Sequence, residues 1–553
     1  MKRLFKRSGG QVLVDALKVH GVDRAFCVAG ESYLDVLNAF YETPEIDLIT
    51  CRQEGGAAFM AETHGKITGK PGICFVTRGP GACNAAIGVH TAMQDSTPLI
   101  LFVGQVARDQ TEREAFQEID YRKMFAPPMT KWAAEITSTE RIPEMVMRAF
   151  QVATSGRPGP VVLALPEDML REKINVIDTA PYRAISSSPS NAELSQIKEI
   201  LETAAKPLAI IGGSGWTDQA CRNFEVFAKE CNLPVAASFR RQDAFNHRSD
   251  NYVGELGTGS NPELLDKVRQ ADVLFVLGAR MGEIATQGYQ IIKPPVPSQK
   301  IIHVHPSAEE LGKVFQADCL VQAGTDAFCR VMANTSPPDR RAGQNWLKEL
   351  REDYLAWTEI QSRDKFVLDV DGVIADLRVK LPEDAIITTD AGNFSGWAQR
   401  YIRYGRPGRL LAPTSGAMGY GVPSAIAASL AYPDRMVIGM MGDGGFMMSG
   451  QELATAIHTK AKPIFMLFNN NMYGTIRMHQ EMNYPGRVSA TKLTNPDFTA
   501  LAQSYGLLAL KVKKTEDFSD AFETASNSGQ ASLIEICMDP EQITTRTKLS
   551  DLK

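Results

Sequence analysis

The chain has 553 residues, a formal net charge of −5 and a hydrophobic content of 44%. This length indicates about three domains with buried cores. Interspersed charges of both signs argue against a nucleic-acid partner or a polybasic membrane contact, and no apolar run reaches the roughly 18 residues of a membrane span. Nine scattered cysteines without a C-x-x-C pair are typical of a reducing compartment, so we expect a cytoplasmic protein.

Apolar runs of strand length recur along the chain between helical patterns. A helix, a short turn and a strand follow one another at residues 12–28, 224–237 and 498–510. This alternation predicts an α/β protein with three doubly wound parallel-sheet domains of similar plan. The runs with the composition of buried parallel strands are residues 72–76, 99–103, 208–211, 274–277 and 301–304.

Two stretches rich in serine and proline indicate linkers, at residues 186–191 and 335–341. They predict three domains, comprising residues 1–180, 190–335 and 350–553.

A carboxylate and an amide follow two apolar runs near the C-terminus. Asp443 comes after the run at 436–440, and Asn470 comes after the run at 464–468. Adjacent strand ends of a parallel sheet meet at one edge, so these two side chains could lie together. With the main-chain carbonyl of Met472 they offer the hard oxygen ligands that Mg²⁺ prefers. The alternative is a pair of ordinary capped turns.

Glycines surround that aspartate. Gly442, Gly444 and Gly445 would let the backbone approach a phosphate closely, at a loop that opens a helix near residues 450–454. Together with the Asp and Asn spacing, this predicts a diphosphate and metal site.

With these motifs the chain resembles the thiamine diphosphate enzymes from end to end, specifically their acetolactate synthase-like branch. The resemblance implies a pyrimidine-binding N-terminal domain, a central Rossmann-like domain and a diphosphate-binding C-terminal domain. It also implies thiamine diphosphate and Mg²⁺ as cofactors, and an active site at the subunit interface of a homodimer or homotetramer.

Glu54 ends the strand-like segment 48–54 and precedes a helix that opens with two glycines. The resemblance implies that this carboxylate contacts N1′ of the aminopyrimidine. A carboxylate in an apolar site has a raised proton affinity, so Glu54 can share a proton with the ring. The alternative is a solvated acid favoured by the helix dipole.

The resemblance also implies the rest of the cofactor site. The carbonyl of Gly416 would accept from the 4′-amino group, and Met418 would wedge beneath the cofactor and bend it, unless it is a core methionine. The cofactor-binding residues are then Gly392, Asn393, Phe394, Gly416, Met418, Gly442, Asp443, Gly444, Gly445, Asn470, Met472, Tyr473 and Gly474.

Substrate residues follow from the same resemblance. Gln117 would hydrogen-bond the substrate, and Phe116 would line its pocket. Family members often have serine at Arg78, where an arginine could bind a substrate carboxylate or form an ion pair. The family's tryptophan falls at about His479, so we expect a more polar pocket. The predicted substrate residues are Arg78, Phe116, Gln117, Thr475, Arg477 and His479.

The central domain leaves the flavin question open. Residues 210–215 and 277–280 resemble family positions near FAD, but the aspartates expected after the strand at 301–304 are His305 and Ser307. FAD, another nucleotide and a purely structural domain are the alternatives.

These observations predict decarboxylation of a 2-oxo acid, followed by carboligation to a carbonyl acceptor. The alternatives are a non-ligating 2-oxo acid decarboxylase, a flavin-containing 2-oxo acid oxidase and a non-catalytic regulatory homologue. The presence of Glu54 argues against the last of these.

Overall fold

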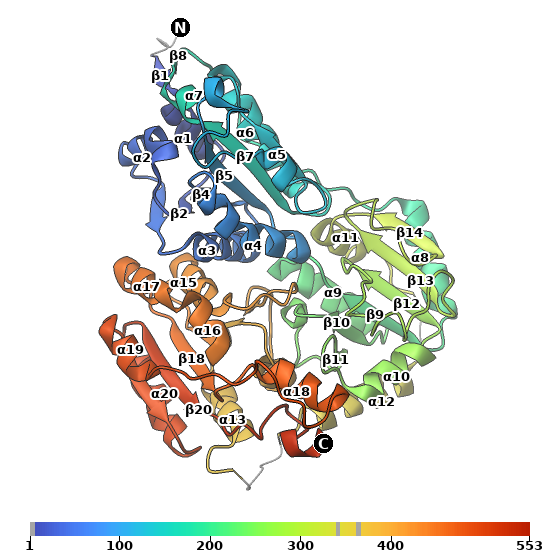
Figure 1. The fold of residues 1–553 in the computed structure, drawn as a ribbon. Coiled ribbons are helices and arrows are strands. Elements are labelled where there is room, and N and C mark those ends of the chain that lie inside the picture. The colour runs from blue at the N-terminus through green and yellow to red at the C-terminus, as the bar shows by residue number, and fades with distance from the viewer. Residues whose placement is uncertain (1–5, 339–342, 361–365, 553) are drawn as a thin grey trace.

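The computed structural model describes residues 6–338, 343–360 and 366–552. Three six-stranded sheets, parallel throughout, form three lobes (Figure 1). A short antiparallel pair, β1 (Arg7–Ser8) with β8 (Lys173–Ile174), closes the N-terminal lobe. Within the described part of the chain, no helix has the length and apolar character needed to cross a membrane.

The N-terminal domain has the strand order β3-β2-β4-β5-β7-β6. Its strands are β2 (Arg24–Cys27), β3 (Asp47–Thr50), β4 (Gly72–Val76), β5 (Leu99–Gln105), β6 (Trp132–Glu135) and β7 (Pro160–Pro166). Its helices are α1 (Gly9–Val19), α2 (Leu34–Tyr41), α3 (Glu54–Thr68), α4 (Pro80–Asp95), α5 (Tyr121–Met124), α6 (Ile142–Thr154) and α7 (Glu167–Arg171).

The central domain has the order β11-β10-β9-β12-β13-β14. Its strands are β9 (Pro207–Ile211), β10 (Val235–Ser238), β11 (Tyr252–Leu256), β12 (Val273–Leu277), β13 (Lys300–His305) and β14 (Cys319–Gln322). Its helices are α8 (Asn191–Thr203), α9 (Asp218–Glu230), α10 (Pro262–Gln270) and α11 (Thr325–Met332). Helix α12 (Gln344–Trp357) straddles the predicted start of the third domain and packs on α10 and β11 of the central one.

The C-terminal domain has the order β16-β15-β17-β18-β20-β19. Its strands are β15 (Ile386–Thr389), β16 (Leu410–Leu411), β17 (Val437–Gly442), β18 (Ile464–Asn469), β19 (Leu508–Val512) and β20 (Ser532–Cys537). Its helices are α13 (Val370–Lys380), α14 (Ser395–Tyr401), α15 (Gly421–Ala431), α16 (Asp443–Ser449), α17 (Leu453–Thr459), α18 (Gly474–Asn483), α19 (Phe498–Ser504) and α20 (Asp517–Asn527).

The three doubly wound α/β domains follow two plans rather than one. Counted from the first strand of each sheet, the N-terminal and C-terminal domains share the order 2-1-3-4-6-5, whereas the central domain has 3-2-1-4-5-6. The helix–turn–strand resemblance seen in the sequence joins strands that occupy different places in their sheets. The repeat therefore lies in the outer two domains, and local pattern did not reveal it.

The N-terminal and C-terminal domains share a continuous hydrophobic core. Ala57 and Ala58 of α3 belong to the same buried cluster as Ala425 and Ala428 of α15. Small side chains let these helices approach closely, which Figure 1 shows at the junction of the two lobes. Helix α3, which begins at Glu54, is thus held against the C-terminal domain of its own chain.

The five predicted strand runs all lie in β-strands, namely β4, β5, β9, β12 and β13. The helix after Gly442 differs from the prediction. It begins at Asp443 itself, as α16, and not near residue 450. The second predicted linker lies partly outside the described residues.

Candidate functional site

A pocket of about 230 Å³ opens at the carboxyl ends of β17 and β18. All thirteen predicted cofactor-binding residues line it, together with Thr475. Neighbouring parallel strands bring Asp443 and Asn470 to one sheet edge, as their spacing predicted. We call this the strand-end pocket. Its other lining residues are Ala391, Phe468, Ile476, Met538 and Ile543.

Asp443 is buried at the base of the strand-end pocket. Its Oδ1 accepts from the amide of Gly444 at 2.9 Å, and its Oδ2 accepts from Nδ2 of Asn495 at 2.7 Å. Burial raises the pKa of this carboxyl, and the Asn495 hydrogen bond opposes that rise. Asn495 lies 52 positions further along the chain, so no local motif linked it to Asp443.

The glycines around Asp443 are required by close contacts. A Cβ at Gly444 would lie 2.5 Å from the Tyr473 ring, and one at Gly445 would clash with Oδ2 of Asp390. Both glycines lie in the first turn of α16, where main-chain N–H groups without helical partners can bind an anion.

The Asn470 loop is fixed by main-chain contacts. Oδ1 of Asn470 accepts from the amide of Met472 at 3.2 Å, and Asn471 adopts a left-handed φ of 56°. The amide of Tyr473 donates to the carbonyl of Thr491 at 2.9 Å. Asn470 is thus preset at the pocket rim.

Thr475 and Asn393 hold the two sides of the strand-end pocket together. The Thr475 hydroxyl donates to Oδ1 of Asn393 at 2.9 Å and accepts from the Asn393 amide at 3.1 Å. Met538 and Ile543, beyond the last strand, also line the pocket. Sequence reasoning missed both, because no motif marks them.

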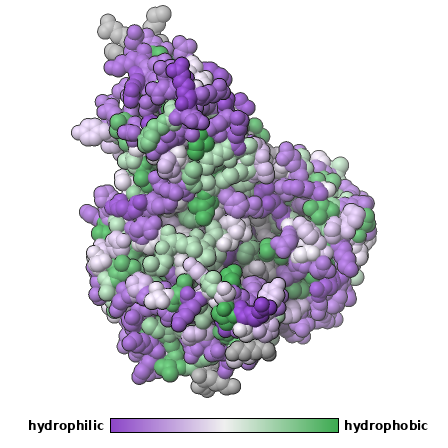
Figure 2. All heavy atoms as spheres, viewed as in Figure 1, coloured by the Kyte–Doolittle hydropathy of each residue, from purple (hydrophilic) through white to green (hydrophobic). Residues whose placement is uncertain are grey.

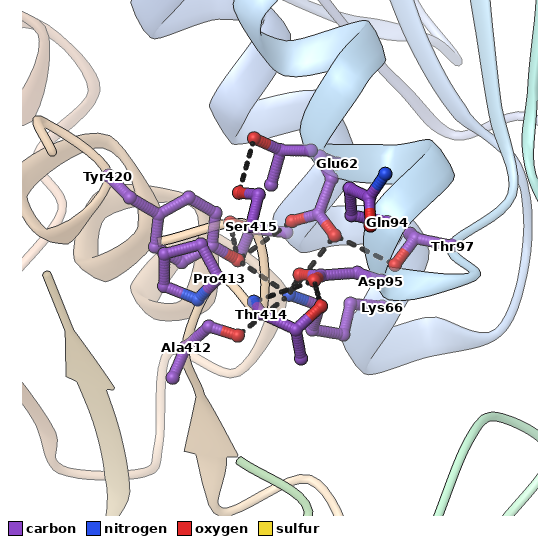
Figure 3. A network of polar contacts seen from close by, with 12 residues as sticks. Glu62, Lys66, Gln94, Asp95, Thr97, Ala412, Pro413, Thr414, Ser415 and Tyr420 are labelled. Carbon is purple, nitrogen blue, oxygen red and sulfur yellow. Dashed lines mark hydrogen bonds and ion pairs between the residues drawn. The ribbon is translucent and has the colours of Figure 1, made fainter. Parts of the chain in front are cut away.

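Gly416 and Met418 lie on a segment between β16 and α15 that is tied to the N-terminal domain of the same chain. Figure 3 shows the buried polar network that joins them. The Tyr420 hydroxyl, at the end of this segment, donates to Oε2 of Glu62 at 2.7 Å and accepts from the Thr63 hydroxyl at 3.0 Å. The segment that carries Gly416 and Met418 is therefore positioned by α3.

Lys66 is the cation of the same network (Figure 3). It pairs with Glu62 at 3.1 Å and with Asp95. Burial acts to lower the pKa of Lys66, but the two acids outweigh it and raise that pKa above its usual range. Asp95 also accepts from the amide of Thr414 at 2.7 Å, which fixes the start of the segment.

Glu54 lies outside the strand-end pocket of its own chain. Its Oε2 accepts from Nδ2 of Asn84 at 2.9 Å, and Gly81 of α4 packs close to its Oε1. Gln117 lies against Gly79, where a Cβ would come within 2.8 Å of the Gln117 Cβ. Together with Arg78 and Phe116, which flank Gly79 and Gln117 in the sequence, these residues form one group, which we call the N-terminal cluster.

Arg78 in the N-terminal cluster is engaged within the chain. Its NH1 pairs with Glu167 at 3.1 Å and its NH2 with Glu31 at 3.7 Å, while Nε donates to the carbonyl of Phe116 at 3.1 Å. The Phe116 side chain is 72% exposed. Of the two alternatives for Arg78, this geometry favours the ion pair over a substrate contact.

The predicted substrate residues on α18 point in different directions. Arg477 pairs with the buried Glu481, four residues on, at 2.5 Å. His479 is exposed. Only Thr475 lines the strand-end pocket.

Two further pockets, of about 390 and 680 Å³, adjoin the carboxyl ends of the central strands. Gly213 and Gly278, both with positive φ near 70°, pack against each other there. At the end of β13, Nδ1 of His305 accepts from the amide of Ser307 at 3.1 Å. Burial lowers the pKa of His305 to about 4, so a neutral ring stands where a carboxylate was expected.

The donor set of the strand-end pocket suits Mg²⁺ with a diphosphate. Among the residues that the structure describes, no group of three or more His, Cys, Asp or Glu is placed to hold a metal. Asp443 supplies one carboxylate and Asn470 one amide oxygen. Mg²⁺ typically combines few protein oxygens with phosphate and water, so this set fits a phosphate-bound magnesium better than an all-protein site.

Comparison with protein families identifies the class. Residues 7–124, 194–332 and 390–536 match the N-terminal TPP binding, central and C-terminal TPP binding domains of thiamine pyrophosphate enzymes. The chain belongs to this family. Thiamine pyrophosphate is another name for thiamine diphosphate.

Relatives that align with most of this chain indicate the branch of the family to which it is similar. The chain is 30% identical to the acetolactate synthase isozyme 2 large subunit of Escherichia coli, covering 96% of each chain. It is 29% identical to a probable acetolactate synthase large subunit of Methanocaldococcus jannaschii, covering 97% of this chain and 92% of the relative. The mitochondrial acetolactate synthase of Schizosaccharomyces pombe is also 29% identical, with 93% and 80% covered. The protein is thus a thiamine diphosphate-dependent enzyme of the acetolactate synthase type.

Proposed function

We propose that this enzyme uses thiamine diphosphate and Mg²⁺ to decarboxylate a 2-oxo acid and to join the remaining fragment to a carbonyl acceptor. The observation that carries the proposal is the strand-end pocket, which assembles the aspartate, the asparagine and the glycine-rich helix start in one place. When bound, thiamine diphosphate supplies the carbon that adds to the keto group and accepts the electron pair left by CO₂.

In this proposal the strand-end pocket binds the charged end of the cofactor. Asp443, Asn470 and the carbonyl of Met472 hold Mg²⁺, and the first turn of α16 faces the diphosphate. Met418 and Gly416 hold the pyrimidine, on the segment that the Tyr420–Glu62 hydrogen bond fixes.

Glu54 holds a proton at N1′ of the pyrimidine bound by a partner subunit. Two observations support a site shared between subunits. The strand-end pocket, at about 230 Å³, is smaller than typical ligand pockets of roughly 300–1,000 Å³ and does not include Glu54. Large apolar side chains are also exposed on α4, α16 and α17, where a partner would cover them. They are Ile87, Met447, Met448 and Ile457.

On the face of the molecule shown in Figure 2, hydrophobic residues gather where the upper lobe meets the lower ones. We propose a cytoplasmic homodimer as the smallest active unit, with a tetramer as the alternative. Gln117 and Thr475 orient the substrate, with Phe116 and His479 covering it from opposite subunits.

The deciding experiment is a panel of 2-oxo acids, each with and without an aldehyde or second 2-oxo acid as acceptor. Carboligation predicts CO₂ release together with a product whose mass combines both substrates. CO₂ with free aldehyde in every reaction would instead identify a plain decarboxylase.

Flavin needs its own measurement. The central pockets leave room for a nucleotide, but the His305 side chain at the end of β13 is neutral. A visible spectrum of the purified enzyme, before and after denaturation, detects FAD directly. A flavin band that substrate bleaches would favour the oxidase alternative.

A further inference from the structure

Glu452, which no motif singled out, is buried between the N-terminal and C-terminal domains of one chain. It ends a 3₁₀ turn (Gly450–Glu452) that directly follows α16. Its side chain has no exposed surface. A buried carboxylate is costly unless hydrogen bonds satisfy it, so its partners indicate its role.

The partners of Glu452 are the two residues that precede Glu54. Oε1 accepts from the main-chain amides of Arg52 at 3.0 Å and Gln53 at 2.9 Å. Oε2 accepts from the Thr455 hydroxyl at 2.6 Å. Charge-assisted bonds to main-chain N–H groups are stronger and shorter than neutral ones.

The helix that carries Glu54 also packs on this carboxylate. A Cβ at Gly56 would lie 2.5 Å from Oε1 of Glu452. Gln53 caps the same helix, its Oε1 accepting from the Gly56 amide at 3.0 Å. The backbone on both sides of Glu54 is therefore fixed through Glu452, while the Glu54 side chain accepts a hydrogen bond from the exposed Asn84 side chain.

We propose that Glu452 is a positioning residue for Glu54, setting the direction in which this acid meets the pyrimidine bound by the partner subunit. The inference rests on the proposed function, because it needs Glu54 to act on that cofactor. Each chain would then use its own diphosphate-binding domain to aim the acid that serves the other chain's cofactor.

Single variants test the chemistry of the contact. Glu452→Ala leaves two main-chain amides without their acceptor, and we expect kcat to fall about 10- to 100-fold, as for a small misplacement of a catalytic group. The KM for the 2-oxo acid and the Kd for thiamine diphosphate should change little. Glu452→Gln should restore most of kcat, since its single amide oxygen can accept from both amides.

A buried acid elsewhere provides the matched control. Asp371 is also buried in the C-terminal domain, where it accepts from Nε1 of Trp397 at 2.7 Å. Asp371→Ala should lower the melting temperature yet leave kcat per folded enzyme unchanged. An equal loss of kcat in the Asp371 and Glu452 variants would overturn the proposal, as would a Gln variant no better than Ala.

Mixed dimers, purified through two different affinity tags, locate the effect. A Glu54→Gln chain paired with an Asp443→Asn chain keeps one intact site, built from the first chain's pocket and the second chain's acid. It should show about half of the wild-type turnover. A mixed dimer without turnover would refute the shared site itself, independently of the role of Glu452.

Two further pairs then isolate Glu452. In a dimer with an Asp443→Asn chain, the Glu452→Ala chain contributes only its pocket to the intact site, and the other chain contributes the acid. Turnover should then match that of the Glu54→Gln/Asp443→Asn dimer, which serves as the reference. In a dimer with a Glu54→Gln chain, the Glu452→Ala chain contributes the only functional Glu54, so turnover should fall about 10- to 100-fold below that of the reference dimer. The reverse pattern would place the effect of Glu452 in its own pocket and overturn the proposal, and loss in both pairs would show general misfolding and also overturn it.

Discussion

The N-terminal and C-terminal domains have the same strand order but carry different chemistry at equivalent strand ends. The third strand of the C-terminal sheet, β17, leads directly into Asp443, whereas the corresponding β4 leads into Thr77 and Arg78. The first strand, β15, is followed by the buried Asp390, and its counterpart β2 by Val28. In the proposed function, one framework thus serves as an anion and metal anchor in one domain and as the carrier of an acid in the other.

The two domains also differ in how complete their sites are. The strand-end pocket assembles all its predicted residues within one chain. In the N-terminal cluster, Phe116 is exposed and Glu54 does not line that pocket. We therefore expect changes in the N-terminal cluster to alter turnover, and changes at the C-terminal strand ends to alter cofactor binding.

The largest expected effect comes from Glu54→Gln. General acid–base groups contribute roughly 10²- to 10⁴-fold, so kcat should fall by that factor while the Kd for thiamine diphosphate stays nearly constant. Stopped-flow kinetics and calorimetry on the same preparation separate the two quantities. Glu140→Gln, an exposed acid in the same domain, is the control. If turnover were unchanged in Glu54→Gln, the N-terminal cluster would not control turnover and the proposed division of roles between the two domains would be wrong.

Asp443→Ala should produce the opposite signature. Without its carboxylate the pocket loses a metal ligand, and the Kd for thiamine diphosphate at fixed Mg²⁺ should rise by about 100-fold, or roughly 2.7 kcal/mol. Isothermal calorimetry measures this directly. Asp497→Ala, an exposed acid capping α19, should bind cofactor like the wild type. If Asp443→Ala bound thiamine diphosphate as tightly as the wild type, the proposed role of Asp443 as a cofactor anchor would be wrong.

Arg78 tests whether the equivalent strand end in the N-terminal domain binds substrate. Its half-buried ion pair with Glu167 predicts that Arg78→Met lowers the unfolding free energy by about 2 kcal/mol, between surface and buried pairs, with the substrate KM unchanged. Arg141→Met, which removes an exposed pair, should lower the unfolding free energy by less than Arg78→Met does. A KM increase of about tenfold or more in Arg78→Met would instead assign substrate binding to Arg78.

The smallest effect concerns pH. Burial raises the pKa of Asp390 to about 6. Since the folded-state pKa lies above the unfolded value, the stabilisation from protonation is complete below about pH 4 and is lost as pH rises through 6. Linkage predicts a loss of about 1.4 kcal/mol between pH 5 and pH 8. Denaturant unfolding of the cofactor-free wild type and of Asp390→Asn isolates this contribution, because the difference between their unfolding free energies should change by this amount between pH 5 and pH 8.

Much of the fold was accessible from local pattern. The five apolar strand runs were placed correctly because buried parallel strands are apolar on both faces. The start of α16 was placed too late, because three glycines in four positions argue against a helix by propensity. Contacts with Tyr473 and Asp390 require these glycines, and tertiary packing therefore outweighed their helix propensity.

The candidate site likewise contains residues that local sequence pattern predicts and residues that only tertiary contacts bring to it. The Asp443 and Asn470 oxygens follow adjacent strands, and strand adjacency brings them together. Asn495, Ile543 and Glu452 are joined to the site only by contacts across long stretches of chain, so no spacing could reveal them.

The sequence by itself determined the class of fold, the positions of five strands and the residues that line the strand-end pocket, because strand-end motifs are local. The tertiary structure alone decided that the outer domains share one topology and that Arg78 is already paired. It also showed that Glu452, which follows α16, accepts hydrogen bonds from the main chain beside Glu54. Those features depend on which distant surfaces pack together, and packing is a property of the whole chain.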